Sequence, residues 1–318
     1  MSILVTGSLC YDYIMDFPGK FEDYIIEDKI HELSVSFNID QLEKNLGGTA
    51  GNIAHTLNFL GRHPIILAPL GKDGDEYIEK LQQKGIDTTY IKQIEKEMTA
   101  SAHITTDKKD NQITAFHNGA LTYTDEMSIK DVEENIDFAI HSPSKPEAFV
   151  KFGKECKEKN IKFAFDPGQQ ITSFSEKQIK SSLKRAHIAI GNDYEIELIT
   201  DQANISEKEL EEQVEILIKT KGPKGSIIKT KEKKLDIEAC SPRENLDPTG
   251  AGDAYRAGFI ASYNSGLDLK TCGQIASTSA VYAVENYGTQ EYEFDQKSFE
   301  KRFKQEYNKK LPDKLFKS

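Results

Sequence analysis

Short apolar runs alternate along most of the chain with segments whose apolar residues recur at helical spacing. The runs have the length and composition of buried strands and lie at residues 3–5, 65–69, 161–165, 188–190 and 226–229. Helical patterns fill the intervals between them. This alternation predicts parallel βαβ units with helices on both faces of one sheet.

Two of the expected helices have clear ends. One begins near Thr49 and ends at Leu60–Gly61, and another covers Asp75 to Lys84 and stops at Gly85. A glycine just after the last apolar position of a helix is typical of a helix C-terminus. These boundaries support the α/β interpretation.

Residues from about 11 to 40 and from about 98 to 119 break the alternation. They contain short alternating segments, such as 102–106 and 112–116, which are typical of antiparallel strands. We expect these segments to form a small sheet, a lid over sites at the strand ends, which closes on substrate and excludes water. The whole chain, residues 1–318, is then a single domain that carries this lid.

Composition narrows the function. The 318 residues carry a formal net charge of −11, which argues against binding to nucleic acid or to an anionic membrane. No targeting or membrane-spanning segment is visible. A basic segment from Lys301 to Lys317 predicts an amphipathic surface helix and a frayed tail. The cysteines lack the paired spacing of a metal site and fit free thiols in a reducing cytoplasm: Cys10, Cys156, Cys240 and Cys272.

The segment Asp247–Ala254 carries the strongest chemical signal. Gly250 and Gly252 place a flexible turn at the start of a helix, where backbone N–H groups converge on anionic oxygens. Asp253, in the first turn, is positioned to take the proton from an alcohol that attacks the terminal phosphate of a nucleotide. An acid that merely caps a helix is the alternative interpretation of Asp253.

Two other glycine-rich phosphate sites are excluded. A dinucleotide-binding fingerprint needs a third glycine where Tyr255 stands, and an apolar strand before the turn, where residues 242–245 are polar. The chain also contains no phosphate-binding loop that ends in Gly-Lys-Ser/Thr.

Further motifs follow the same order as those of a known family. Gly47–Asn52 places paired glycines before a helix, Asn192–Glu195 follows a strand, and Thr220–Gly225 forms a tight turn between a helix and a strand. With Asp247–Ala254 last, the set resembles the ribokinase-type (phosphofructokinase B) family of carbohydrate and nucleoside kinases. Shorter matches at residues 5–8, 17–19, 34–37, 166–170, 253–259 and 288–292 resemble its bacterial adenosine kinases. The resemblance covers nearly the whole chain and implies a three-layer α/β/α domain with a mainly parallel sheet and a small β-sheet lid.

The resemblance implies which residues catalyse the transfer, which bind the nucleoside and which bind ATP. Asp253 would be the catalytic base, and the backbone of Gly250, Ala251 and Gly252 would form an anion hole. Residues that would hold the nucleoside are Ser8, Asp12, Ser36, Gly48, Asn52, Phe116 and Gln170. Residues that would lie along ATP are Asn192, Thr220, Gly222 and Gly225. Alternatively, Asn52 is a polar residue at a helix start, Asp12 a turn acid and the turn glycines only close a loop.

Cations are implied as well. Glu195 and Asn192 would hold Mg²⁺ through water, which suits an ion that keeps much of its hydration, although helix capping also explains this pair. Asp247 and the 285–288 segment match the region where members of the family bind a monovalent cation, so K⁺ stimulation is an expectation.

The expected activity is the ATP-dependent phosphorylation of adenosine at its ribose 5′-hydroxyl. Phe116 offers an aromatic face to a base, but Ala102 stands where adenosine kinases have a second aromatic residue, and Leu121 differs nearby. A ribose or fructose kinase is therefore an open alternative, and a ligand sensor without catalysis is a third. The resemblance is also compatible with a homodimer that pairs through lid edges.

Overall fold

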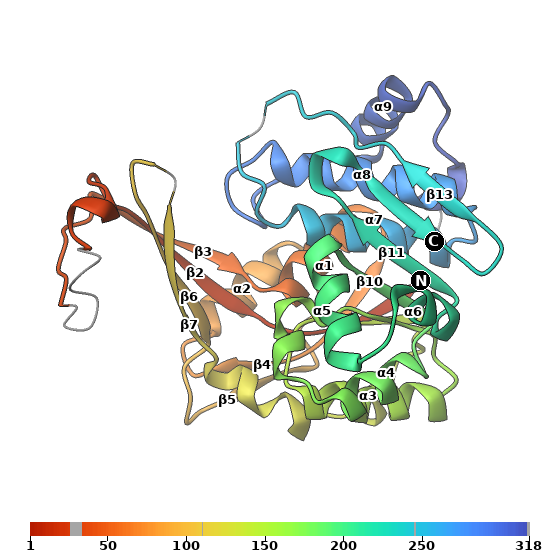
Figure 1. The fold of residues 1–318 in the computed structure, drawn as a ribbon, viewed down its shortest axis with the longest axis horizontal. Helices are drawn as coiled ribbons and strands as arrows, with labels where there is room; N and C mark the ends of the chain where they lie inside the picture. Colours follow the sequence, from red (N-terminus) through yellow and green to blue (C-terminus); the bar gives the residue numbers. More distant parts are fainter. Residues whose placement is uncertain (26–33, 110, 245, 317–318) are drawn as a thin grey trace.

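A nine-stranded sheet runs through the centre of the molecule (Figure 1). The computed structural model describes residues 1–25, 34–109, 111–244 and 246–316. The order across the sheet is β13-β12-β11-β10-β9-β8-β1-β4-β5. The strands are β1 (Ser2–Thr6), β4 (His63–Gly71), β5 (Ile91–Ile94), β8 (Phe138–His141), β9 (Phe163–Phe165), β10 (Ile188–Asn192), β11 (Ile216–Thr220), β12 (Ser226–Lys229) and β13 (Lys234–Ile237).

The sheet is parallel from β5 to β11 and antiparallel at one edge, where β12 pairs with β11 and β13 with β12. The expected strand at 226–229 therefore exists, but its expected parallel direction is wrong. The turn at Thr220–Gly225 joins two strands and not a helix and a strand, and the Lys221 N–H donates to the Gly225 carbonyl at 2.8 Å to close it. A turn this short leaves no room for the crossover that parallel strands require.

Helices cover both faces of this sheet. Because side chains alternate along a strand, Ile3 and Val5 of β1 enter one hydrophobic cluster and Leu4 enters the other. The first face carries α1 (Thr49–Phe59), α2 (Asp75–Gln83), α7 (Ala251–Asn264), α8 (Leu269–Val284) and α9 (Gln296–Tyr307). The opposite face carries α3 (Pro146–Glu158), α4 (Glu176–Leu183), α5 (Asp193–Ala203) and α6 (Glu207–Gln213). The result is the three-layer α/β/α arrangement that the sequence predicts.

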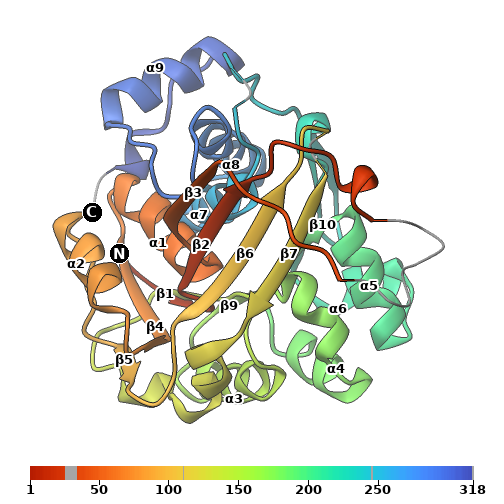
Figure 2. The ribbon, with the colours of Figure 1, turned by 90° about the vertical axis from the view of Figure 1, so that its left-hand side faces the viewer.

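A separate four-stranded sheet, which we call the small sheet, projects from one side of this body (Figures 1 and 2). Its order is β3-β2-β6-β7, formed by β2 (Cys10–Asp16), β3 (Gln41–Gly47), β6 (Ala100–Thr106) and β7 (Gln112–His117). β3 lies beyond residues 11–40, the segment that the sequence predicts to contribute to this sheet. Residues 26–33 and 110, which also belong to the predicted lid segments, lie outside the described residues.

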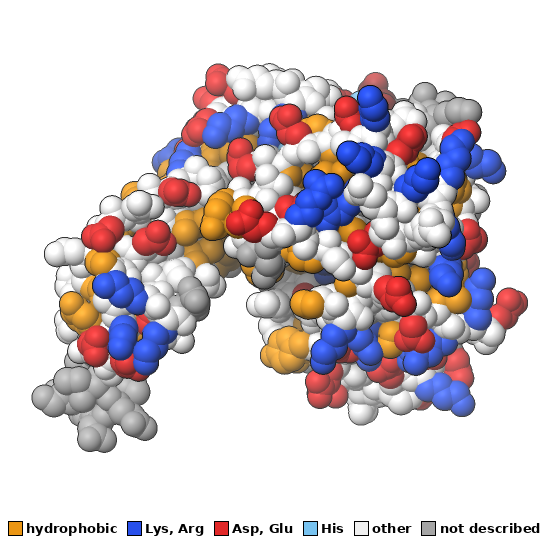
Figure 3. Space-filling model, turned by 90° about the horizontal axis from the view of Figure 1, so that it is seen from above, with side chains coloured by type: hydrophobic (Ala, Val, Ile, Leu, Met, Phe, Trp, Pro, Cys, Tyr) orange, Lys and Arg blue, Asp and Glu red, His pale blue; other side chains and the backbone are white. Residues whose placement is uncertain are grey.

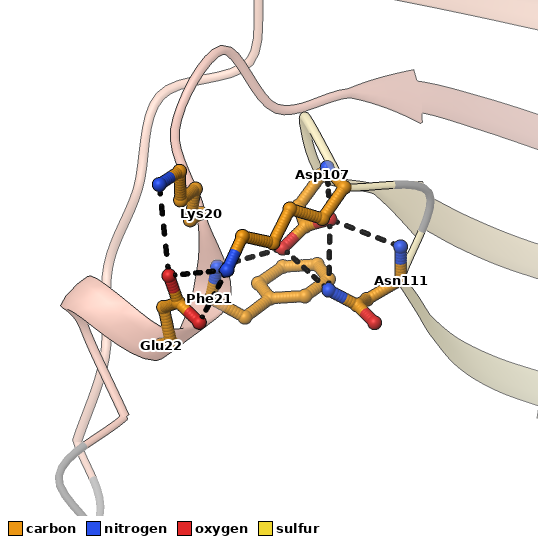
Figure 4. A network of polar contacts seen from close by, with 6 residues as sticks. Lys20, Phe21, Glu22, Asp107 and Asn111 are labelled. Atoms are coloured by element: carbon orange, nitrogen blue, oxygen red, sulfur yellow. Dashed lines mark hydrogen bonds and ion pairs between the residues drawn. The ribbon is translucent and has the colours of Figure 1, made fainter.

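The outer tip of the small sheet is held by polar contacts (Figure 4). The buried carboxylate of Asp107, at the β6–β7 turn, accepts from the Phe21 N–H at 2.9 Å and from the Asn111 N–H at 3.0 Å. Lys109 donates to Glu22 at 2.7 Å. These bonds join the segment after β2 to the β6–β7 hairpin.

The C-terminal segment differs from the sequence expectation. α9 is the predicted helix, but the following residues are not a frayed tail, because Leu311 and Leu315 are buried in the first hydrophobic cluster. The Arg62 guanidinium also donates to the Leu315 carbonyl. Residues 317–318 lie outside the described part. No helix in the described ranges has both the length and the apolar character needed to cross a bilayer.

Candidate active site

The start of α1 is shaped by Ser8 and Gly48. Gly48, at the N-cap, has a φ of 88°, and a side chain there would bring its Cβ to 2.5 Å from the Ser8 carbonyl oxygen. Ser8 accepts from the Thr49 N–H through its hydroxyl at 3.1 Å and from the Ala50 N–H through its carbonyl at 3.0 Å. Ser8 thus satisfies two N–H groups that a helix start otherwise leaves unpaired.

The start of α7 is different, because its N–H groups remain open. Gly250 caps it with a φ of 79° and no side-chain cap bond. Among the described residues, the N–H groups of Gly252 and Asp253 have no acceptor, whereas that of Ala251 reaches the Pro248 carbonyl at 3.3 Å. Unpaired N–H groups at the positive end of a helix dipole attract an anion. Of the residues expected to form the anion hole, Gly250, Ala251 and Gly252, Ala251 already donates to Pro248, and the open N–H groups extend to Asp253 instead.

Asp253 and Asn52 come together from helices 201 positions apart in the sequence. The Asn52 Nδ2 donates to Asp253 Oδ2 at 2.8 Å, and the Gln290 Nε2 donates to Asn52 Oδ1 at 3.0 Å. Because a carboxylate only accepts, Asn52 must turn its NH₂ to Asp253 and its oxygen to Gln290. Gln290 is buried and also donates to the Tyr77 hydroxyl at 2.9 Å.

The pKa of Asp253 lies above its ordinary value. Burial is the largest cause, and the charge of Glu195 adds to it. The positive charge of Arg256 and the hydrogen bond from Asn52 act in the opposite direction. A carboxylate with a raised pKa is a stronger base than an exposed one, which suits an acid that must accept a proton.

Asp12 on β2 is the second carboxylate of the site. The Cys10 thiol donates to Asp12 Oδ1 at 3.6 Å, and a side chain at Gly47 would clash with the Asp12 carboxylate. Burial raises the pKa of Asp12 to about 6, with the Cys10 bond opposing and the charges of Asp253 and Asp247 adding. The Asp253 charge thus reaches Asp12, which is consistent with the two acids lining one site.

The small sheet places Asp12, Ala102 and Phe116 in one row. Asp12 pairs with Ala102, and Ala102 pairs with Phe116, so all three side chains share a face. Ala102 is buried beside Leu121, whereas 47% of the Phe116 surface is exposed. The position where a second aromatic residue was expected is thus directly opposite Phe116. Figure 3 shows the hollow between the projecting small sheet and the body.

Ser36 is not brought to this site. It is exposed, and its neighbour Phe37 packs on Phe17 at 4.6 Å between ring centroids, just beyond the outer end of β2. The outer end at Asp16 lies roughly 13 Å along the strand from Asp12. Gln170 lies in a 3-10 helix (Gly168–Ser173) that packs against α5.

Asn192 and Glu195 form a capping box at the start of α5. Asn192 Oδ1 accepts from the Glu195 N–H and Glu195 Oε2 from the Asn192 N–H, each at 2.8 Å. The capping interpretation is therefore realised. It leaves Glu195 Oε1 without a hydrogen-bond donor among the described residues.

The other expected nucleotide and cation residues lie at the same edge of the central sheet. Asn192 is the register partner of Thr220, which opens the turn containing Gly222 and Gly225. Asp247 accepts from the Gly288 N–H at 3.4 Å, so it meets the 285–288 segment as expected. The carboxyl ends of parallel strands are a common position for ligand sites.

Arg256 and Asp166 were missed as functional candidates. Arg256 Nε lies 2.5 Å from Asp166 Oδ2 and its Nη2 donates to Asp166 Oδ1 at 2.8 Å, while Nη2 lies 3.4 Å from Glu195. Both residues stand within quoted family stretches, 166–170 and 253–259. An arginine among small residues on a buried helix face was the signal available in the sequence.

The chain is similar to several known proteins in sequence and in fold. Residues 4–295 match the model of the pfkB family of carbohydrate kinases. The chain is 35% identical to a nucleoside kinase of Methanocaldococcus jannaschii, over 84% of this chain and 89% of that protein. It is 34% identical to a nucleoside kinase of Methanothermobacter thermautotrophicus, over 91% of each. The structure superposes with a TM-score of 0.88 on Burkholderia thailandensis nucleoside kinase in complex with inosine, at 32% identity, covering 97% of this chain and 99% of that one.

Proposed function

The chain belongs to the pfkB family of carbohydrate kinases, and we propose that it transfers the γ-phosphate of ATP to the 5′-hydroxyl of a nucleoside, most specifically adenosine. The observation that carries the proposal is the pairing of Asp253 with Asn52 beside the open N–H groups of α7. A base and an anion hole on one helix turn are the parts that phosphoryl transfer to an alcohol needs.

The proposed reaction uses the free oxygen of Asp253. Since Oδ2 holds Asn52, Oδ1 takes the proton as the 5′-oxygen bonds to the γ-phosphorus. The bond from that phosphorus to the bridging oxygen breaks, and ADP leaves with the electron pair. The N–H groups of Gly252 and Asp253 receive the charge of the transferred group.

Asp12 and Asn52 are proposed to bind the ribose hydroxyls. A carboxylate accepts from two hydroxyl groups, and Asn52 offers a second amide hydrogen besides the one bound to Asp253. Phe116 is proposed to stack on the base, with Gln170 at its edge and Ser36 reaching it only when the small sheet closes. The contribution of the Asp253 charge to the raised pKa of Asp12 supports a ribose that binds near both carboxylates.

Magnesium fits the site if ATP supplies most of its ligands. No group of three or more His, Cys, Asp or Glu within the described ranges can hold a metal ion. Glu195 Oε1 is the carboxylate oxygen left for a metal-bound water, and Mg²⁺ commonly binds through one carboxylate and substrate phosphates. Bound there, the ion would neutralise phosphate charge.

Potassium is proposed as an activator at the contact between Asp247 and the 285–288 segment. Backbone carbonyls of these two turns would be its ligands, because the Asp247 oxygens already accept from the N–H groups of Thr249 and Gly288. Turnover measured in K⁺ and in a bulky organic cation tests this, and equal rates would contradict it.

The acceptor is tested with a coupled kinase assay across adenosine, inosine, guanosine, ribose and fructose. Adenosine is expected to give the highest kcat/KM, because an aromatic face and an amide serve a purine and add nothing for a free sugar. The inosine complex of the Burkholderia relative supports a purine nucleoside, and leaves inosine as the alternative. A higher kcat/KM for ribose or fructose would favour the sugar kinase, and no turnover with any acceptor would favour the sensor.

A further inference from the structure

The guanidinium of Arg256 lies behind the anion hole, one helical turn after Asp253. Only 8% of the residue is exposed. Its Nε and Nη2 face Asp166, at 2.5 and 2.8 Å, and Nη2 also faces Glu195. Two of its three nitrogens are therefore fixed by buried acids, which orients the whole planar group.

The third nitrogen, Nη1, lies close to Gly252, whose N–H group is open at the α7 start. A Cβ built on Gly252 would lie 2.7 Å from Nη1, so this nitrogen is beside the N–H groups at the α7 start. Among the described residues Nη1 has no hydrogen-bond acceptor. A charged donor thus remains open beside the backbone donors.

The surrounding charges keep this group cationic. Burial acts to lower the pKa of Arg256, but the carboxylates of Asp166, Asp253 and Glu195 outweigh burial and raise that pKa. Asp166 and Glu195 are the two of these acids that contact Arg256 directly. Arg256 therefore brings a full positive charge to a cradle that otherwise offers N–H dipoles.

We propose that Arg256 is a catalytic residue, whose Nη1 donates to an oxygen of the transferred phosphoryl group while Asp166 holds the guanidinium in place. The proposal rests on the proposed kinase function. Charge spread over the three equatorial oxygens is what a fixed arginine stabilises in phosphoryl transfer. The alternative is that Arg256 serves only to pair with Asp166 and Glu195.

Two variants separate these roles. Arg256→Met alone would leave Asp166 buried and unpaired, so Asp166→Asn is the matched background. Asp166→Asn retains Nη1, and Asp166→Asn/Arg256→Met removes it without stranding a buried charge. The measurements are kcat, the nucleoside Kd by calorimetry, the melting temperature and the Kd of ADP with aluminium fluoride and nucleoside.

The double variant is expected to lose about 100-fold or more in kcat relative to Asp166→Asn, as for the loss of one oxyanion donor. Binding of the aluminium fluoride complex should weaken in the same proportion, with nucleoside Kd and melting temperature unchanged. Equal kcat and equal aluminium fluoride affinity in the two variants would overturn the proposal. If the double variant does not fold, Arg256→Lys is compared with the wild type instead. Lysine can still pair with Asp166, but it cannot reach Asp166 and the anion hole together, so the same loss of kcat is expected.

A wild-type enzyme that turns over no acceptor would contradict the proposed function itself. That outcome is distinct from equal kcat in the two variants, which contradicts only the role of Arg256.

Discussion

The two ends of the proposed substrate site are built in different ways. Around Asp253, hydrogen bonds run without a break through Asn52 and Gln290 to Tyr77, all within the packed body. Around Phe116, on the last strand of the small sheet, the side chain is 47% exposed and faces the short Ala102. We therefore expect residues of the packed body to govern phosphoryl transfer and residues of the small sheet to govern the choice of acceptor.

The largest effect is expected at the fixed end. Asp253→Asn keeps a side chain of the same shape but removes the base, so kcat should fall by about 10⁴-fold while nucleoside Kd stays within a few fold. Steady-state kinetics and calorimetry measure the two quantities. Asp268→Asn, which changes the capping acid of the next helix, is the control and should retain full turnover. Unchanged kcat in Asp253→Asn would remove the base assignment.

Gln290→Leu tests whether the fixed end depends on its supporting hydrogen bonds. Without the donor to its oxygen, Asn52 can rotate its amide and present that oxygen to Asp253, which would raise the pKa of Asp253 further. We expect kcat to fall by roughly tenfold and the acid limb of the kcat/KM profile to move to higher pH. Gln274→Leu, a buried glutamine on α8 outside the site, should shift neither quantity. An unmoved acid limb would show that Asn52 needs no such support.

These networks mark the limit of what the sequence predicts. The helices at 49–60 and 75–84 and most strands follow from local periodicity, and Asp253 with Asn52 follows from motif order. The bond between Asp166 and Arg256 joins residues 90 positions apart, and no local pattern encodes it. The predicted direction of β12 is wrong for a related reason, because the run before Thr220 is the strand β11 and not the helix that the sequence predicts. The contacts of Leu315, which include the hydrogen bond from Arg62 to its carbonyl, likewise come from residues far away in the sequence.

Phe116→Ala tests the projecting end. Stacking of a base on an aromatic ring contributes about 1–3 kcal/mol, so nucleoside KM should rise by roughly tenfold with kcat nearly unchanged. Ile113→Ala is the matched control, since Ile113 is an exposed apolar residue of the same strand on the opposite face. A fall in kcat with unchanged KM would mean that the small sheet acts on chemistry and not on acceptor choice.

The smallest effect is expected at Asp12, where the two ends meet. Burial raises the pKa of Asp12 in the folded protein to about 6, above the ordinary 3.8. The folded state therefore holds this proton more tightly than the unfolded state, and stability falls as pH rises through that interval and stays lower above it. Asp12→Asn removes this cost, by about 1 kcal/mol once partial solvent exposure is allowed for.

The variant should melt about 1–2 °C above the wild type at pH 8 and show no gain near pH 4. Thermal scans at both pH values check this, with Asp16→Asn as control, because Asp16 is exposed farther out on the same face of β2. Nucleoside KM should rise in Asp12→Asn at every pH, since the amide cannot accept from two hydroxyls as a carboxylate does. A gain in stability together with a loss of affinity would show that Asp12 is kept at a cost to the fold for the sake of the ribose. An equal gain at pH 4 and pH 8 would assign the effect to packing.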